Sequence, residues 1–383
     1  MSLLYLVAGE ASGDVLGARV MQALRARRPG LAFAGIGGAR MAEQGLVSLF
    51  PMEELSLMGL AEVVPKLPRL LRRLAEAEAD VLAKRPDALI TIDAPSFTLR
   101  LAGRVHAKGV RTIHYVAPQV WAWRPGRVRK IARKVDRLLA LLPFEPPFFR
   151  AAGILTDFVG HPVIESGADR GDAISFRSRF ELDGRRPVLA VMPGSRRGEL
   201  ARHLPIFTRA CALLRERRPD LALFVPTLPH LEAIVRAAPW PVAPIIATDA
   251  PTKHDGWAAA TAALAKSGTT SLELAVAGLP HVVAYRANPL TATIVRRLVR
   301  VRHASLVNLL AGREVVPERL QERCTAEALA EALHRLLGEE PARQAQRAAF
   351  SAIVADLRPP NGLSPSQAAA EAILADVSRG PPR

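Results

Sequence analysis

The chain has 383 residues, of which 49% are hydrophobic and 5% aromatic, and its formal net charge is +16. This length exceeds what one hydrophobic core usually serves, so we expect two ordered domains and exclude a disordered protein. No stretch approaches the roughly 18 to 20 uncharged apolar residues of a spanning helix, and no basic segment precedes Glu10 as in a secretory signal. We therefore expect a cytoplasmic protein, and the separated thiols Cys211 and Cys324 fit a reducing compartment.

Short apolar runs alternate with longer helical patterns, which is typical of parallel α/β sheets. The pattern predicts strands over residues 3–8, 33–36, 88–92, 112–116, 138–142 and 157–159, and again over 188–192, 221–225, 262–265 and 281–285. The intervening stretch VGHPVIESGADRGD has the Gly, Pro and Asp content of a linker. Helical patterns alone fill the chain from about Cys324 to Val377.

These patterns predict two Rossmann-like, doubly wound domains that face a cleft. The first domain is expected over residues 1–163 and the second over residues 172–355. Residues 356–383 should form a helical segment that packs back on the first domain.

The basic excess predicts an anionic partner, because 52 Lys and Arg stand against 36 Asp and Glu. It is uneven: residues 100–137 contain eleven Lys or Arg and one acid, Asp136. Nucleic acid, an anionic membrane and a phosphorylated substrate are all candidates, and an Arg-rich surface without a specific partner would explain part of the excess. The stretch HYVAPQVWAWRPGRVRKIARK could stack and contact nucleic acid, but its two Trp lie in one short loop rather than along a groove.

The loop VAGEASGDVLG, at residues 7–17, joins the first predicted strand to a helix. Its glycine spacing fits neither the dinucleotide fingerprint nor the P-loop, and Glu10 and Asp14 would repel a pyrophosphate. Two interpretations remain: an anion site at a helix start, or a tight turn in which Ser12 caps the helix.

Asp93 is the sharpest catalytic candidate. In LITIDAPSF an apolar strand delivers this carboxylate at its carboxyl end, and Pro95 then opens the next helix. Ligands of doubly wound sheets bind outside the carboxyl ends of the strands, so Asp93 is placed to act as a general base. The structural alternative is that Asp93 only caps the helix.

The second half contains two turns suited to an anion. LAVMPGSRRGEL runs from a strand through Gly194 and Ser195 to Arg196 and Arg197, whose guanidinium groups bind phosphate well. AALAKSGTTSLELAVAG offers the N–H and hydroxyl donors of residues 267–271, with Glu273 one turn later as a candidate acceptor for ribose hydroxyls. Two such turns in one domain favour a nucleotide diphosphate, although plain capped helices would look similar.

Metal ligands are not predicted, since no D-x-D, H-E-x-x-H or C-x-x-C motif occurs. His114 and His281 lie inside apolar strands, where core histidines are expected, and His161 lies in the linker, where it could serve a hinge or contact a ligand.

A leucine stripe with basic flanks lies in MGLAEVVPKLPRLLRRL. Such stripes usually belong to a core, but the basic neighbours also fit a helix lying on an anionic membrane, where each cation adds about 1 kcal/mol. The predicted membrane contacts are Val63, Val64, Lys66, Leu67, Arg69, Leu70, Leu71, Arg72, Arg73 and Leu74.

Ten ordered motifs make the chain closely similar to lipid-A-disaccharide synthases, a bacterial family of GT-B glycosyltransferases. They run nearly end to end: VAGEASGDVLG, MGLAEV, IDAPSF, HYVAPQVWAWR, LPFE, VGHP, MPGSRRGE, SGTTSLE, YR and NLLAGRE. The resemblance implies inverting transfer from UDP-2,3-diacylglucosamine to 2,3-diacylglucosamine 1-phosphate, with no metal or other cofactor. It also implies peripheral attachment to the inner face of the cytoplasmic membrane of a Gram-negative cell, and no nucleic-acid partner; it leaves the oligomeric state open.

By the same resemblance, Asp93 takes the proton of the acceptor hydroxyl and Arg196 stabilises departing UDP. The donor contacts that it implies are Arg196, Ser267, Gly268, Thr269, Thr270, Glu273, Asn308 and Gln321, to which the turn pattern itself adds Gly194 and Ser195. Apart from the resemblance, we expect Ser12, Gly13 and Asp14 on the acceptor side, because the two turns better suited to a diphosphate lie in the second domain.

The chain departs from the family pattern at four places. Ser96 replaces a usual acid, Thr98 a usual Asn, the usual VPELLQ reads VPERLQ, and residues 245–260 fit poorly. The rival interpretations are a UDP-sugar 2-epimerase of similar architecture and a basic nucleic-acid-binding protein.

Overall fold

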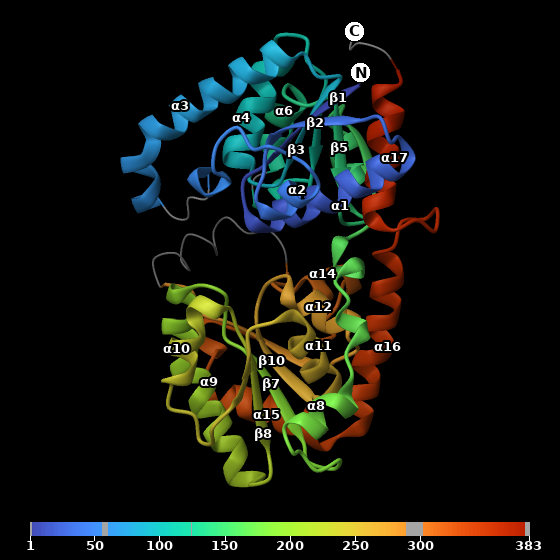
Figure 1. Cartoon of the computed structure of the whole chain (residues 1–383). Helices are drawn as coiled ribbons and strands as arrows, with labels where there is room; N and C mark the ends of the chain where they lie inside the picture. Colours follow the sequence, from blue (N-terminus) through green and yellow to red (C-terminus); the bar gives the residue numbers. More distant parts are fainter. Residues whose placement is uncertain (1, 56–59, 124, 289–301, 380–383) are drawn as a thin grey trace. The chain divides into compact units, whose positions relative to one another are not determined.

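The computed structural model describes residues 2–55, 60–123, 125–288 and 302–379, and for residues 60–66 it describes the backbone only. The chain divides into two compact units, Met1–Pro162 with Leu357–Arg383, and Val163–Asp356. Each unit is built on a six-stranded sheet whose described pairings are all parallel (Figure 1). The predicted α/β class with two Rossmann-like halves is confirmed.

The first sheet has the strand order β2-β1-β3-β4-β5-β6. Its strands are β1 Leu3–Ala8, β2 Ala32–Ile36, β3 Ala88–Ile92, β4 Thr112–Tyr115, β5 Arg137–Ala140 and β6 Leu155–Phe158. The helices of this unit are α1 Ala11–Arg27, α2 Ala39–Glu43, α3 Leu60–Lys84, α4 Pro95–His106, α5 Val120–Trp123, α6 Val128–Ala132, α7 Glu145–Arg150 and α17 Pro365–Val377, with 3-10 turns Met52–Leu55 and Pro125–Arg127.

The central strands of this sheet are apolar because helices cover both faces. Every residue of β3 is buried, and Leu6 of β1 lies in register between Gly35 of β2 and Ile90 of β3. Such continuous apolar runs are characteristic of parallel strands, and this is why the sequence pattern located them.

Helix α17 returns to the first unit and lies beside α1 (Figure 1). Its Ala369 and Ile373 are fully buried in the core of that unit. Near its end, buried Asp376 pairs with Arg111 at 3.1 Å and with Arg137 at 3.0 Å. Removing one partner of a buried ion pair costs about 3–5 kcal/mol, so this pairing ties the last helix to the first sheet.

The second sheet has the strand order β12-β11-β10-β7-β8-β9. Its strands are β7 Val188–Met192, β8 Ala222–Pro226, β9 Ile245–Ala247, β10 Ala262–Lys266, β11 His281–Tyr285 and β12 Glu318–Leu320. The helices are α8 Ala173–Arg179, α9 Arg197–Arg217, α10 Glu232–Arg236, α11 Ala250–Ala259, α12 Thr270–Val276, α14 Leu306–Ala311, α15 Ala326–Gly338 and α16 Glu340–Asp356, with 3-10 turns Pro162–Glu165, Ala168–Arg170, Pro229–Leu231 and Gln321–Arg323.

The two faces of the second sheet belong to separate hydrophobic clusters. Along β7, Leu189 and Val191 point into one cluster, whereas Val188, Ala190 and Met192 point into the other. The apolar pattern of the sequence does not predict β9 and β12, the two edge strands. Each has only three residues, which is too short to show an apolar period.

Candidate functional site

Asp93 follows β3 at the carboxyl edge of the first sheet, where the backbone is strained. Asp93 and Ala94 have φ values of 50° and 44°, in the left-handed region that non-glycine residues rarely adopt. The Asp93 N–H donates to the Tyr115 carbonyl at 3.0 Å, and the side chain is half-buried. The N-cap of α4 is Ala94 and no side chain caps this helix, so the interpretation of Asp93 as a cap is wrong.

Thr98 stabilises this strained turn from inside α4. Its buried hydroxyl lies 2.6 Å from the Asp93 carbonyl and 3.0 Å from the Ala94 carbonyl, so both oxygens compete for one donor. Strained residues of this kind cost about 1–3 kcal/mol each and persist only when the surroundings hold them. Thr98 is therefore a candidate positioning residue for Asp93.

The loop after β1 lies beside Asp93. A Cβ at Gly9 would stand 2.6 Å from the Cβ of Ala94, and one at Gly13 would stand 3.3 Å from the Ile92 carbonyl. Only a glycine at position 9 allows the two strand ends to approach so closely. Ser12 is exposed in this loop, and it does not cap α1, whose N-cap is Glu10 with no capping side chain.

Asp14 does not have the predicted role on the acceptor side. Its buried carboxylate accepts three backbone N–H bonds, from Gly38 at 2.8 Å, Arg40 at 2.9 Å and Met41 at 3.0 Å. These bonds fix the start of α2 and supply the hydrogen-bond partners that a buried carboxylate needs. Asp14 is thus a framework residue.

Glu145, in the LPFE motif, is a buried acid whose place in the site is not predicted by its motif alone. Its carboxylate accepts hydrogen bonds from Trp121 Nε1 at 3.0 Å and from the N–H groups of Leu141 and Leu142 at 3.1 and 2.9 Å. Burial raises the pKa of Glu145 to about 7, although these three donors oppose the rise. The bonds join the loops after β4 and β5, and the first of these loops begins with Val116, whose φ of 78° is also left-handed.

Helix α3 carries the predicted apolar stripe, but only part of the stripe is exposed, and the rest is buried in the core. Leu67 and Leu71 are 39% and 45% exposed, whereas Leu74 is 3% exposed and belongs to the core, with Leu70 packed against it. Leu74 therefore cannot meet a membrane, because it anchors the helix. The side chains of Val63, Val64 and Lys66 lie outside the described part of the chain.

The basic residues of α3 also differ in how far their side chains are exposed. Arg73 is largely buried, pairs with Glu54 at 2.7 Å and Glu76 at 2.7 Å, and lies over the Phe50 ring, so it braces the helix instead of facing a membrane. Arg69 also pairs with Glu54, at 2.8 Å, but its side chain is 56% exposed.

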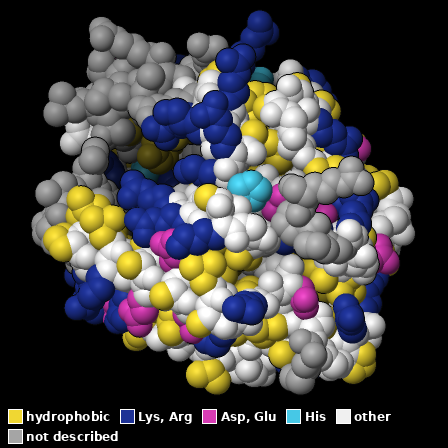
Figure 2. Space-filling view, turned by 90° about the horizontal axis from the view of Figure 1, so that it is seen from above, with side chains coloured by type: hydrophobic (Ala, Val, Ile, Leu, Met, Phe, Trp, Pro, Cys, Tyr) yellow, Lys and Arg dark blue, Asp and Glu magenta, His cyan; other side chains and the backbone are white. Residues whose placement is uncertain are grey.

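On the face shown in Figure 2, Lys and Arg are interspersed with hydrophobic side chains and are more frequent than Asp and Glu. No described helix is both long and apolar enough to cross a bilayer.

The turn between β7 and α9 is tight in the second unit. Gly194 has φ +140°, and a Cβ there would lie 2.7 Å from the Cβ of Glu199. The Ser195 N–H donates to the Glu199 carboxylate at 3.0 Å, and Arg196 pairs with the same group at 3.2 Å while remaining 54% exposed. Ser195 and Arg196 thus lie at the carboxyl edge of the sheet, but the Ser195 N–H is already bonded to Glu199, and anion binding by this turn stays a prediction.

The turn after β10 keeps some of its predicted donors and loses one. Thr269 is exposed, Gly268 and Thr270 are half-buried, and the Ser267 hydroxyl donates to the Ala304 carbonyl at 3.1 Å. Ser271, which was included among the donors, is fully buried and bonded to His281 Nε2 at 2.8 Å. Its hydroxyl cannot reach a phosphate.

Glu273 lies in the first turn of α12, half-buried, with Lys253 Nζ at 3.6 Å. Its carboxylate remains partly open to solvent, which suits the predicted contact with ribose hydroxyls. The segment that fitted the family poorly folds as β9 and α11, and α11 carries this Lys253.

Asn308 does not have its predicted role as a donor contact. It is fully buried, and its amide makes four hydrogen bonds: two to the Val316 carbonyl and Glu318, and two from the N–H groups of Val315 and Val316, all between 2.7 and 2.9 Å. A saturated, buried amide supports the loop and cannot contact the donor. Gln321 differs, since it is only half-buried and has a left-handed φ of 53° directly after β12.

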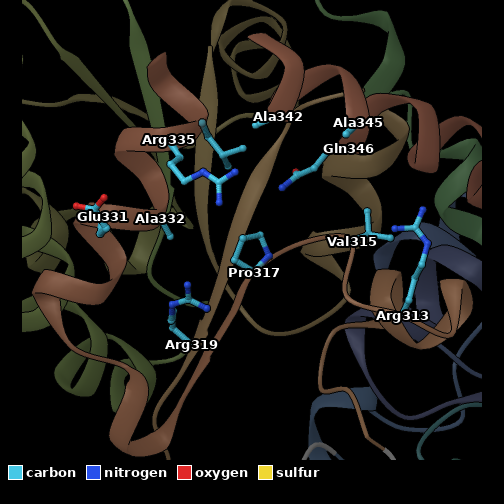
Figure 3. Close-up of a pocket in the computed structure, with 11 residues that line it drawn as sticks. Arg313, Val315, Pro317, Arg319, Glu331, Ala332, Arg335, Ala342, Ala345 and Gln346 are labelled. Atoms are coloured by element: carbon cyan, nitrogen blue, oxygen red, sulfur yellow. The ribbon is translucent and has the colours of Figure 1, made fainter. Parts of the chain in front are cut away.

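A pocket of about 420 Å³ is lined by residues of β12, α15 and α16 and by the loop that holds Val315. Figure 3 shows Arg319 and Arg335 pointing into the same space, with Arg313 apart beside Val315. None of the predicted donor residues lines it, so we do not assign it to the reaction.

Burial lowers the pKa of His114, His161 and His281 to about 4, as expected for neutral interior histidines. In the described part of the chain, no three His, Cys, Asp or Glu residues are grouped to hold a metal.

Comparison with known sequences gives a consistent result over nearly the whole chain. The model of the lipid-A-disaccharide synthetase family matches residues 4–372. The lipid-A-disaccharide synthase of Gluconobacter oxydans (strain 621H) is 51% identical over 371 residues, covering 96% of this chain and 89% of that protein. The synthase of Rhodospirillum centenum (strain ATCC 51521 / SW) is 51% identical over 382 residues, covering 98% and 95%.

Solved structures with the same fold are far less similar in sequence. The Staphylococcus aureus MnaA–UDP co-structure has a TM-score of 0.63 at 14% identity, covering 100% of this chain and 99% of that chain. Acinetobacter baumannii MurG has a TM-score of 0.56 at 13% identity, covering 99% and 100%. At these identities the likeness shows the GT-B-type architecture alone.

The role of Thr98 can be tested by substitution. Thr98→Val keeps the shape but removes the hydroxyl, so the Asp93 turn should relax and turnover should fall on the order of tenfold or more, because small misplacements of a reacting group are costly. Thr98→Ser retains the donor and should recover most of the rate. Steady-state kinetics would show a lower kcat with UDP affinity unchanged in Thr98→Val; equal rates for both variants and the wild type would refute the role.

Proposed function

The chain belongs to the lipid-A-disaccharide synthase family, and from this premise we propose how its residues carry out the transfer. The enzyme is a hexosyltransferase that joins UDP-2,3-diacylglucosamine to 2,3-diacylglucosamine 1-phosphate. The products are the β-1,6-linked disaccharide 1-phosphate and UDP. The observation that carries the proposal is Asp93, a half-buried carboxylate at the strained carboxyl end of β3.

Asp93 is the general base of the first unit. Its carboxylate takes the proton of the acceptor 6-hydroxyl while that oxygen attacks the anomeric carbon of the donor sugar. The bond from this carbon to the β-phosphate oxygen breaks, and its electron pair leaves with UDP. Because attack and departure occur on opposite faces, the configuration inverts from α to β. Ser12 and the backbone at Gly13, beside the Asp93 turn, help to seat the acceptor.

The second unit binds the donor. Ser195 and Arg196 approach its phosphates from the turn after β7, and Ser267, Gly268, Thr269 and Thr270 from the turn after β10. Glu273 accepts hydrogen bonds from the ribose, and Gln321 contacts the donor from the end of β12. We propose that no metal ion takes part, because side-chain cations and N–H groups at these turns supply the charge that UDP needs as it leaves.

The two rival functions are not favoured. Two UDP-N-acetylglucosamine 2-epimerases share the fold, but their sequences are only 12–14% identical to this chain, whereas the synthases are 51% identical along almost the full length. No comparison favours a nucleic-acid partner, and we propose that the basic surface serves acidic lipids and the phosphorylated substrates.

We propose that α3 attaches the protein to the anionic inner face of the cytoplasmic membrane, where acylated substrates reside. Leu67 and Leu71 are exposed apolar side chains, and Arg69 and the exposed Arg72 flank them. Leu70 lies between the core and this face. A helix with an apolar stripe and flanking cations is suited to lie in the interfacial plane.

Asp93→Asn should keep the fold and lose nearly all transfer, because an amide cannot accept the hydroxyl proton. General-base removal costs on the order of 10²–10⁴ in rate. Asp87→Asn is the matched control, since Asp87 precedes the same strand at its other end and bonds Leu3. Disaccharide formation at the wild-type rate by Asp93→Asn would exclude the base assignment.

Leu71→Asp should weaken binding to vesicles containing phosphatidylglycerol by roughly tenfold, since burying one Leu side chain contributes about 1.5–3 kcal/mol. Ile174→Asp is the control, because Ile174 is 82% exposed on the second unit. Co-sedimentation with vesicles measures both variants. If Leu71→Asp binds as the wild type does, α3 is not the membrane contact.

A further inference from the structure

Glu199 and Lys266 form an ion pair that links the two anion-binding turns of the second unit. The Glu199 carboxylate is 8% exposed; one oxygen accepts the Ser195 N–H at 3.0 Å, and the other accepts Lys266 Nζ at 2.9 Å. Ser195 belongs to the turn after β7, and Lys266 is the last residue of β10. One carboxylate therefore connects both turns.

The Lys266 ammonium lies over the turn that follows it. A Cβ at Gly268 would stand 3.6 Å from Nζ, and the Tyr285 ring centre lies 5.7 Å away, at the end of β11. The side chain is 18% exposed, so the ammonium is neither sealed in the core nor free in solvent. An ammonium has three N–H donors, and one of them is sufficient for Glu199.

The charges of this cluster do not balance. Arg196 also pairs with Glu199, at 3.2 Å, so two cations share one carboxylate. Burial raises the pKa of Glu199, but the hydrogen bonds from Lys266 and Ser195 and the charges of Lys266 and Arg196 outweigh it and leave that pKa below its usual value. Glu199 is therefore ionised, and the cluster carries one net positive charge between the two turns.

We propose that Lys266 is a ligand of the donor diphosphate, oriented by Glu199, and that it stabilises the negative charge on UDP as the bond to the sugar breaks. This inference rests on the proposed donor site. Lys266 is better sheltered than Arg196, whose side chain is 54% exposed, so a phosphate oxygen that reaches it is attracted through less water. A compact ammonium can turn its remaining donors to the ligand while keeping its bond to Glu199.

The alternative is that the pair only braces the turns, and ligand titrations separate the two roles. Calorimetry on the full chain would compare UDP, UMP and uridine binding by the wild type, Lys266→Met and Lys266→Arg. Arg217→Met, which breaks an exposed ion pair with Glu331 at the other end of α9, is the matched control. If Lys266→Met does not fold, Lys266→Gln replaces it.

A diphosphate ligand predicts that Lys266→Met loses on the order of tenfold to a hundredfold in UDP affinity, less for UMP, and nothing for uridine. Lys266→Arg should recover part of the loss, and Arg217→Met should match the wild type. Unchanged UDP affinity in a folded Lys266→Met, or an equal loss for all three ligands, would overturn the role of Lys266. A wild type that binds none of them would instead overturn the proposed donor site itself.

Discussion

Both candidate sites depend on one constraint of parallel sheets, namely that all strands end at the same edge. At that edge the chain must leave the ladder and enter a helix within a few residues, and the backbone there is under strain. Six described non-glycine residues have a left-handed φ, and four of them, Asp93, Ala94, Val116 and Gln321, lie in the first two positions after a strand. The other two, Arg85 and Glu181, lie just after α3 and α8. Each such residue costs about 1–3 kcal/mol, which the surrounding packing offsets. Most of the strained positions thus lie at the strand ends, where substrates are expected to bind.

The loops at these edges are held by buried polar residues that do not face solvent. Asp14 accepts three N–H groups at the start of α2, and the Asn308 amide makes all four of its hydrogen bonds to residues 315–318. Glu145 does the same for the loops after β4 and β5. Removing such a residue leaves buried N–H or carbonyl groups unpaired, so we expect loss of loop order as well as loss of stability. These residues explain why long motifs surround so few side chains that can contact a substrate.

The sequence was sufficient for the fold and for the location of Asp93. Continuous apolar runs gave ten strands, but the three-residue edges β9 and β12 carry no period and were missed. The roles of Asp14 and Asn308 could not be predicted, because a polar residue in a motif looks the same whether its partner is a ligand or the backbone. Lys266 could not be predicted for a related reason: in AALAKSGTT it only follows an apolar run, and its bond to Glu199 joins residues 67 positions apart.

Transfer of an acylated sugar between the two substrates is tested most directly by a complete reaction. Purified protein would be mixed in detergent micelles with UDP-2,3-diacylglucosamine, with and without 2,3-diacylglucosamine 1-phosphate, and UDP release and the lipid product would be followed. UDP should appear only when both substrates are present, in equal amount to a β-1,6-linked disaccharide 1-phosphate. UDP release without the acceptor, or conversion of the donor to its 2-epimer without any disaccharide, would contradict the assignment.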